Sequence, residues 1–313
     1  MTDEDNAEDE RTRAELVDDR APPAATPVPQ GRVADRYTLL RELGRGGMGT
    51  VYSAYDEELD RKVAIKLLHH APSGSLGAPR LLGEAQALAR LSHPNVVQVY
   101  DVGEIGDQVF LAMEYVQGDT LREWQRAAPR SWREVLAVYR QAGEGLAAAH
   151  AAGLVHRDIK PDNLMLGQDG RVRVMDFGLA RRRSSHREDA RMPSGRILLP
   201  DEQQPTGGLT GTPAYMSLEQ LRGENVGAEA DTFALCVSLW EGLHGARPFA
   251  GKSVGELRSQ VAYGRIVDPP PDRPTPRWLR EILLRGLAAD PAQRWPSTAT
   301  MLAAIDRGLL RTQ

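Results

Sequence analysis

Cysteine is almost absent from this sequence, since Cys236 is the only one among 313 residues. A single cysteine excludes an intramolecular disulfide framework, and its place in an apolar run favours a buried thiol over a nucleophile. Long apolar segments are missing too: no stretch of about 18 uninterrupted apolar residues occurs, and no basic-then-apolar signal opens the chain. The seven histidines show no metal-binding cluster. These features favour a cytoplasmic protein without a membrane segment.

The acidic residues are concentrated at the N-terminus. The formal net charge of the chain is −4, but residues 1–20 carry nine acids and three arginines, so the rest of the chain is near +2. A Pro-rich connector over residues 21–29 follows. Because so charged a segment has little to bury, we expect residues 1–35 to be a disordered tail, either a solvated leader or an interaction segment.

Alternation of apolar and polar residues predicts strands between residues 37 and 114. After residue 114, apolar residues recur mainly at helical spacing. The predicted strands cover residues 37–43, 50–55, 62–68, 96–102 and 108–114. Helices are predicted over residues 81–91, 133–151 and 228–243. Five antiparallel strands with one main helix, followed by a mainly helical part, make an α+β fold.

A glycine cluster follows the first predicted strand and contains Gly44, Gly46 and Gly49. Such a pattern alone is shared by dinucleotide-binding folds and ordinary turns. Here the residues after Gly49 alternate as a strand, so the glycines lie in a hairpin loop and not at a strand-to-helix turn. Glycines at such a bend let backbone N–H groups approach phosphate oxygens.

Lys66 closes the otherwise apolar strand Val63-Ala-Ile-Lys66. A lysine in such a place needs a charged partner, and Glu84 on the following helix is well placed to be that partner. Alternatively, Lys66 extends to solvent and Glu84 is a helix-surface residue.

The segment around residue 158 is the densest group of polar residues between apolar flanks. It contains His156, Arg157, Asp158, Lys160 and Asn163. We expect packing and hydrogen bonding from the histidine. Asp176 follows thirteen residues after Asn163, where a strand runs into a glycine turn. Asp and Asn oxygens from two neighbouring loops suit Mg²⁺ that also keeps phosphate ligands.

In this order, the motifs resemble those of a Hanks-type serine/threonine protein kinase, most closely its bacterial branch, over about residues 37–308. The resemblance implies a two-lobed fold with an N-lobe over residues 36–115, a hinge over 114–118, a C-lobe over 119–308 and a tail over 309–313. It also implies ATP and Mg²⁺ as cofactors, with Mn²⁺ as an alternative, and proteins as substrates. We expect no nucleic-acid partner.

The resemblance assigns roles to individual residues. The ATP phosphates would be covered by Gly44, Gly46 and Gly49, and held by Lys66 paired with Glu84. The adenine would lie between Leu43, Val51, Ala64 and Met165, with its edge on the backbone of Glu114 and Val116. Asp158 would be the catalytic base, Lys160 the cation near the transferred phosphate, and Asn163 and Asp176 the metal ligands.

Serine/threonine preference is implied by Lys160 and by Thr212 in the Gly-Thr-Pro-x-Tyr segment. Arg157 beside Asp158 resembles the arrangement in kinases switched on by loop phosphorylation, with transient self-association for autophosphorylation. The candidate phosphosites are Thr206 and Thr210, then Ser184 and Ser185. The arginine run in the same loop is either a solvated face or a site for an acidic partner.

One departure from the family pattern is Leu218, where the family usually has proline, which puts the loop geometry in doubt. Glu219 is retained, and Arg294 is its expected buried partner. Asp231 resembles the residue that anchors the catalytic loop, with a helix N-cap as the alternative. Two other functions stay open, a pseudokinase that only binds nucleotide and a small-molecule kinase.

Overall fold

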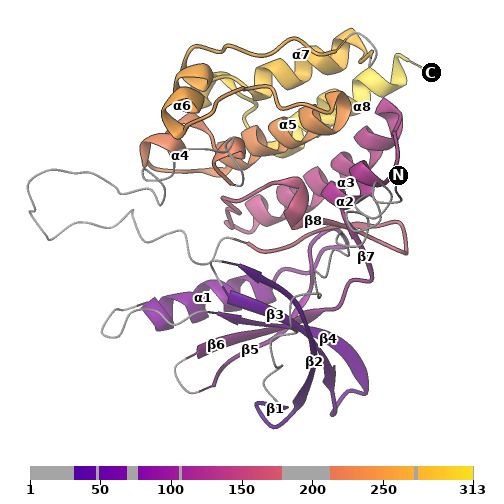
Figure 1. Cartoon of the computed structure of the whole chain (residues 1–313), viewed down its shortest axis with the longest axis vertical. Helices are drawn as coiled ribbons and strands as arrows, with labels where there is room; N and C mark the ends of the chain where they lie inside the picture. The colour runs from indigo at the N-terminus through magenta and orange to yellow at the C-terminus, as the bar shows by residue number, and fades with distance from the viewer. Residues whose placement is uncertain are drawn as a thin grey trace, which may run out of the picture.

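The computed structural model describes residues 32–46, 49–68, 77–105, 108–177, 212–270 and 274–312. It shows an antiparallel, curled sheet formed by the N-terminal part and a mainly helical C-terminal part at the other end of the molecule (Figure 1). The α+β architecture predicted from the sequence is therefore confirmed.

The N-terminal sheet has the strand order β1-β2-β3-β4-β6-β5, and every neighbouring pair is antiparallel. Its strands are β1 (Arg32–Val33), β2 (Tyr37–Gly46), β3 (Gly49–Asp56), β4 (Arg61–Leu68), β5 (Val99–Ile105) and β6 (Gln108–Glu114). The helix α1 (Gly77–Ala89) lies against β5 and β6. β3 contains Thr50 and Val51 and β4 contains Val63 and Ile65, β-branched residues that suit a half-buried pleated surface.

Three predictions for the N-terminal part need correction. The sheet has six strands, because β1 pairs with β2, and the expected disordered tail over residues 1–35 therefore extends too far. Val33 is buried, and Arg36 donates two hydrogen bonds to Asp56, both 2.7 Å long, which fixes this turn to the sheet. The strand expected from residue 96 begins at Val99, because Val96 bridges to the distant Val174 instead.

The C-terminal part consists of helices and a small sheet. The sheet has the order β7-β8-β9, with β7 (Gly118–Thr120), β8 (Leu164–Gly167) and β9 (Val172–Val174). The helices are α2 (Leu121–Ala127), α3 (Trp132–Ala151), α4 (Leu218–Arg222), α5 (Ala228–His244), α6 (Val254–Ala262), α7 (Arg277–Gly286) and α8 (Thr298–Leu310). Short 3₁₀ turns cover Pro161–Asn163, Thr212–Tyr215 and Pro291–Gln293.

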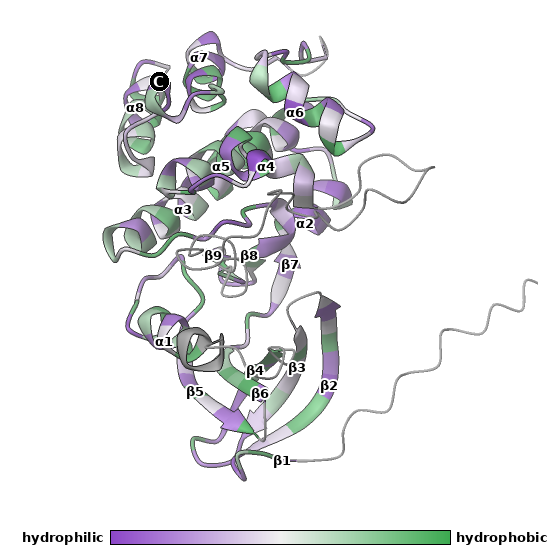
Figure 2. Cartoon of the chain, turned by 90° about the vertical axis from the view of Figure 1, so that its left-hand side faces the viewer, coloured by the Kyte–Doolittle hydropathy of each residue, from purple (hydrophilic) through white to green (hydrophobic). Residues whose placement is uncertain are grey.

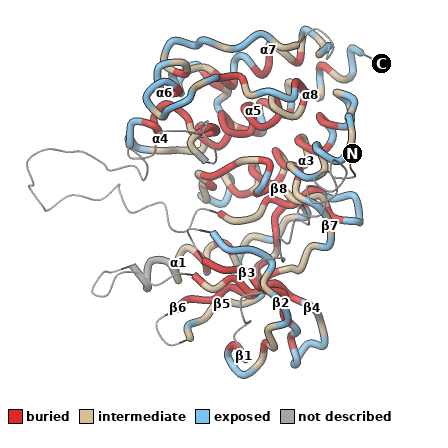
Figure 3. Tube along the Cα trace, viewed as in Figure 1, coloured by how far each residue is buried: buried red, intermediate tan, exposed pale blue. Residues whose placement is uncertain are grey.

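The core of the helical part is built around α5, which is buried almost along its whole length (Figure 3). Helices α6, α7 and α8 mix hydrophilic and hydrophobic residues, as amphipathic outer helices do (Figure 2). The last helix continues to Leu310, so the tail expected over residues 309–313 begins too early. Ser297 caps the start of α8, and Gly308 near its end packs closely on the Trp278 ring.

Candidate active site

The loop that carries Asp158 is held by Asp231 on the buried helix α5. The Asp231 carboxylate accepts hydrogen bonds from the backbone N–H groups of His156 and Arg157, at 2.7 and 2.6 Å. His150 Nε2 lies 2.8 Å from the same carboxylate. Arg157 has a left-handed backbone, with φ of 66°, which a non-glycine residue adopts only when its surroundings impose it. Asp231 is thus a loop anchor and does not cap α5, whose N-cap is Gly227.

His156 is completely buried beneath this loop. Its Nδ1 accepts a hydrogen bond from the backbone N–H of Asp158 at 3.2 Å, and its Nε2 lies 2.6 Å from the Met175 carbonyl oxygen. These partners place the ring proton on Nε2. Burial lowers the pKa of His156, so the imidazole is neutral and links the Asp158 loop to the segment before Asp176.

Three of the predicted polar residues meet in this loop. Lys160 Nζ donates to Asp158 Oδ2 at 3.0 Å. Asn163 Nδ2 donates to the backbone oxygen of Asp158 at 2.7 Å and lies 3.2 Å from its Oδ2. The carboxylate is therefore oriented by one cation and one amide, and it is largely buried.

Lys66 reaches across from β4 to Asp176. Its Nζ donates to Asp176 Oδ1 at 2.8 Å, and the lysine itself is buried. Among its contacts within the described residues, this carboxylate is its partner and Glu84 is not. The expected Lys66–Glu84 pair is thus not formed here, although the neighbouring Ala85 and Leu88 of α1 are buried. A buried ammonium needs a carboxylate, and Asp176 supplies it.

The glycine cluster lies where β2 turns into β3. Gly44 pairs with Val51 and Gly46 pairs with Gly49 across the hairpin, as the strand alternation predicted. A Cβ at Gly49 would overlap the Leu67 carbonyl oxygen on β4. Only glycine therefore lets β3 approach β4 so closely at this position.

The predicted adenine-binding residues fall into two groups. Val51, Ala64 and Val116 belong to one apolar cluster, which also contains Met113 and Met175. Met175 is a residue that the sequence did not single out, because its neighbours in this cluster are more than fifty positions away along the chain. The cluster lies beside the Lys66–Asp176 pair, because Lys66 is two positions after Ala64 on β4 and Asp176 comes directly after Met175.

Leu43 and Met165 lie outside that cluster as far as the structure describes it. Leu43 is exposed on β2, and Met165 is on β8, paired with Arg173 on β9. Arg173 Nη2 lies 2.8 Å from Glu114 Oε1, and its Nη1 donates to Asp169 at 2.8 Å. The segment predicted to be the hinge is thus tied to the small sheet by an arginine that sequence motifs did not reveal.

The two residues predicted to hold a metal, Asn163 and Asp176, come from neighbouring segments of the chain. The Met175 N–H donates to the Asn163 carbonyl oxygen at 2.9 Å, which brings Asn163 and Asp176 close together. The described residues contain no group of three or more His, Cys, Asp and Glu side chains that could hold a metal alone. One carboxylate and one amide fit Mg²⁺, which usually keeps waters and substrate phosphates in its shell.

A second network borders the Asp158 loop and was not predicted. Arg122 on α2 donates to Asp162 of the loop at 3.0 Å and to Glu241 of α5 at 3.3 Å. Arg122 also hydrogen bonds to the Tyr215 hydroxyl, which donates to Glu241 at 2.6 Å. The loop, the 3₁₀ turn after residue 211 and α5 are therefore joined by one guanidinium.

Leu218 begins α4 directly after Ser217, which caps the helix together with Gln220. At this first helical position the backbone N–H has no partner within the helix, so a proline is not needed to start it. Gln220 also donates to the Arg157 carbonyl oxygen at 2.9 Å. The start of α4 is therefore capped with leucine in this place, and the loop before residue 212, whose geometry this departure put in doubt, lies outside the described residues.

The predicted buried pair is present, with Arg294 Nη1 and Nη2 at 2.7 and 2.9 Å from the two oxygens of Glu219. Burial alone would raise the pKa of Glu219, but the Arg294 hydrogen bonds and charge outweigh it and hold that pKa below its usual value. The remaining predictions of this region lie outside the described residues: the side chain of Thr212 and the candidate phosphosites Thr206, Thr210, Ser184 and Ser185.

Comparison with known proteins places this site in a family. Residues 37–304 match the family described as "Protein kinase domain". The chain is similar to the serine/threonine-protein kinase PrkC of Bacillus subtilis, with 35% identity over 282 residues, 88% of this chain and 40% of that protein. It is also similar to the serine/threonine-protein kinase PknL of Mycobacterium tuberculosis, with 35% identity over 287 residues, 90% of this chain and 67% of that protein.

A third relative is the probable serine/threonine-protein kinase PknB of Lactococcus lactis, with 33% identity over 278 residues, 87% of this chain and 42% of that protein. The chain thus spans about two fifths of the length of several relatives. It belongs to the protein kinase family, on its bacterial serine/threonine side. Among the described helices, none is both long and apolar enough to span a bilayer.

Proposed function

We propose that this chain is an active serine/threonine protein kinase that transfers the γ-phosphate of ATP to hydroxyl groups of proteins. The observation that carries the proposal is the contact of Asp158 with both Lys160 and Asn163, next to the Lys66–Asp176 pair. A chain that only bound nucleotide would have no need of an oriented carboxylate at this point.

Each of these side chains has a task in such a transfer. Asp158 accepts the proton of the substrate hydroxyl, and Lys160 balances negative charge beside it. Lys66 would hold the α- and β-phosphates of ATP, and Asp176 and Asn163 would hold Mg²⁺. Bound Mg²⁺ would supply neutralisation of the phosphate charge. Positioning and electrostatics do most of the work in phosphoryl transfer.

Regulation through the loop after Asp176 is part of the proposal. Arg157 follows the family arrangement in which a phosphate on that loop meets an arginine, with Thr206 and Thr210 as the first candidates. The pairing of Lys66 with Asp176 in this structure supports a state that needs activation, because family activity requires Lys66 to pair with Glu84. Phosphorylation of the loop would then stabilise the Lys66–Glu84 pair. One chain would phosphorylate the loop of another when the two meet.

The test is incubation of the full chain with labelled ATP and Mg²⁺. We expect label on serine or threonine, a loss of about 10²-fold or more in Asp158→Asn, and near-normal label in the control Asp268→Asn, which removes an exposed charge outside the site. Peptide mapping of the labelled protein then locates the phosphosite. Equal labelling of wild type and Asp158→Asn would refute the proposal.

A further inference from the structure

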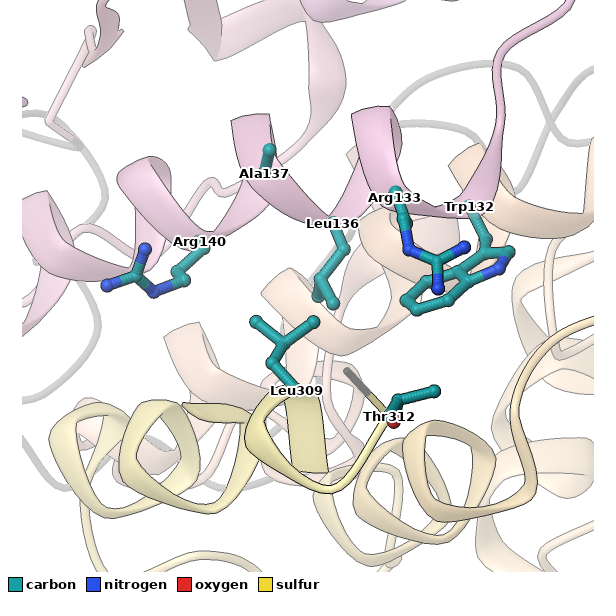
Figure 4. Close-up of a pocket in the computed structure, with 7 residues that line it drawn as sticks. All are labelled: Trp132, Arg133, Leu136, Ala137, Arg140, Leu309 and Thr312. Atoms are coloured by element: carbon teal, nitrogen blue, oxygen red, sulfur yellow. The ribbon is translucent and has the colours of Figure 1, made fainter. Parts of the chain in front are cut away.

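Two neighbouring pockets open along α8, at the end of the helical part away from the sheet. The first, about 260 Å³, lies between α3 and α8 and is lined by Trp132, Leu136 and Leu309 (Figure 4). The second, about 320 Å³, lies between α7 and α8 and is lined by Trp278 and Trp295. The Trp132 and Trp278 rings meet edge to face at 6.2 Å, so the pockets adjoin. We call the two together the α8 groove.

The α8 groove is strongly basic. Its lining contains one acidic residue, Glu281, and five arginines: Arg133, Arg140, Arg285, Arg307 and Arg311. Glu281 is already paired with Arg277 at 2.9 Å. Arg140 is also paired, with Glu144 and Asp306.

The other four arginines differ from the paired ones. Arg133 lies over the Trp132 ring at 4.4 Å and Arg285 over the Trp295 ring at 4.1 Å. Within the part of the chain that the structure describes, these two and the exposed Arg307 and Arg311 form no ion pair with a carboxylate. Four arginines that pair with no carboxylate among the described residues, placed around apolar pockets, favour an acidic ligand that also carries an apolar side chain.

This chain contains a segment with that chemistry. Residues 1–20 carry nine acids and three arginines. Their only branched apolar residues, Leu16 and Val17, stand together between Glu15 and Asp18-Asp19. We propose that the α8 groove binds the acidic segment 1–20 of a second copy of this chain, with Leu16 and Val17 in the pockets and the flanking carboxylates on the arginines.

The length of the tether favours the segment of a neighbouring molecule over the chain's own. The described chain starts at Arg32 in β1, which lies at the end of the molecule opposite to α7 and α8 (Figures 1 and 2). The fifteen residues from Val17 to Arg32 span at most about 52 Å when fully extended. A domain of about 280 residues has a radius of gyration of about 19 Å, and the path around half of an equivalent sphere is about 75 Å. The segment therefore reaches a neighbouring molecule more easily.

The direct test uses a fluorescent peptide of residues 1–20 and the full chain at a concentration too low for self-association. We expect saturable anisotropy, about tenfold weaker binding to Arg307→Glu/Arg311→Glu, and weaker binding in high salt. Arg258→Glu is the matched control, because Arg258 is an exposed α6 arginine that lines neither pocket, and we expect it to bind like wild type. Thermal melting of each variant checks that the fold is retained.

Two further arms complete the test. A peptide with Leu16→Ser and Val17→Ser binds wild type about tenfold more weakly if these residues enter the pockets, and this arm needs no change in the folded protein. Sedimentation of the full chain should show self-association that rises with concentration and is lost in Glu15→Gln/Asp18→Asn/Asp19→Asn.

Absence of peptide binding to wild type, or equal binding to the groove variant, would overturn the proposal. So would a chain that stays monomeric at every concentration but binds the peptide only after its own segment is neutralised, because that result would assign the groove to the same molecule. None of these measurements depends on catalytic activity, so failure of the kinase proposal would leave them unaffected.

Discussion

Replacing Glu219 by glutamine removes the charge partner of the fully buried Arg294. In the wild type all five guanidinium N–H groups have acceptors: the two Glu219 oxygens and the carbonyl oxygens of Ala288, Glu229 and Ala289, at 2.7–3.2 Å. The variant leaves a buried cation without its carboxylate. Breaking such a pair from one side costs about 3–5 kcal/mol in the free energy of unfolding.

For a domain of this size, that loss lowers the melting temperature by about 6–15 °C. Differential scanning calorimetry of wild type and Glu219→Gln measures it. The double variant Glu219→Leu/Arg294→Leu should lose less than the sum of the two single changes, because no charge is left buried alone. Additive losses would refute the reasoning, and so would a Glu219→Gln protein that melts within about 2 °C of wild type.

The same pair predicts a pH dependence. The pKa of Glu219 is lower in the folded than in the unfolded chain, so its contribution to stability is complete above about pH 4.5, the ordinary value, and is lost as the pH falls through the folded pKa. Glu219→Gln should lack this contribution. Its stability curve should therefore approach that of wild type in acid, and a constant difference down to pH 3 would contradict the assignment.

The other variants test the start of α4, the fit of α8 and the anchor of the Asp158 loop. Leu218→Pro should change the free energy of unfolding by less than about 1 kcal/mol in thermal melts, because Ser217 is already extended and the position starts a helix; a loss above about 3 kcal/mol would contradict this. Gly308→Ala should lower stability by about 1–3 kcal/mol through overlap with the Trp278 ring, and a rise in melting temperature would show that the contact is loose. Asp231→Asn should reduce phosphate transfer by about 10²-fold with little change in ATP affinity, whereas an unchanged rate would remove its role as loop anchor.

Much of the fold and part of the site could be predicted because their signals are local. The alternation around Lys66 places it on a strand, and the spacing of Asp158 and Asn163 within six positions places both in one loop. Their contact in the structure follows from that short separation. The Glu219–Arg294 pair was predictable only through the family resemblance, since the two residues are 75 positions apart.

Two of the wrong or missing predictions depended on packing between distant segments, and one on a strand too short to show a pattern. Lys66 of β4 pairs with Asp176 and not with Glu84. This depends on how α1, which carries Glu84, and the end of β9, which leads to Asp176, lie relative to β4. The first strand was missed because a two-residue strand has no periodicity, and Val33 is held by its pairing with Tyr37. The Arg122 network likewise joins residues up to 119 positions apart, and no local pattern marks it.

Transfer of phosphate from Mg²⁺-ATP to a serine or threonine acceptor, measured together with the affinity for ATP, tests the central claim most directly. We predict that wild type and Asp158→Asn bind ATP equally well, and that only wild type transfers phosphate at an appreciable rate, with a difference of about 10²–10⁴-fold. Equal ATP binding with no transfer by either protein, even after its loop threonines are phosphorylated, would contradict the account.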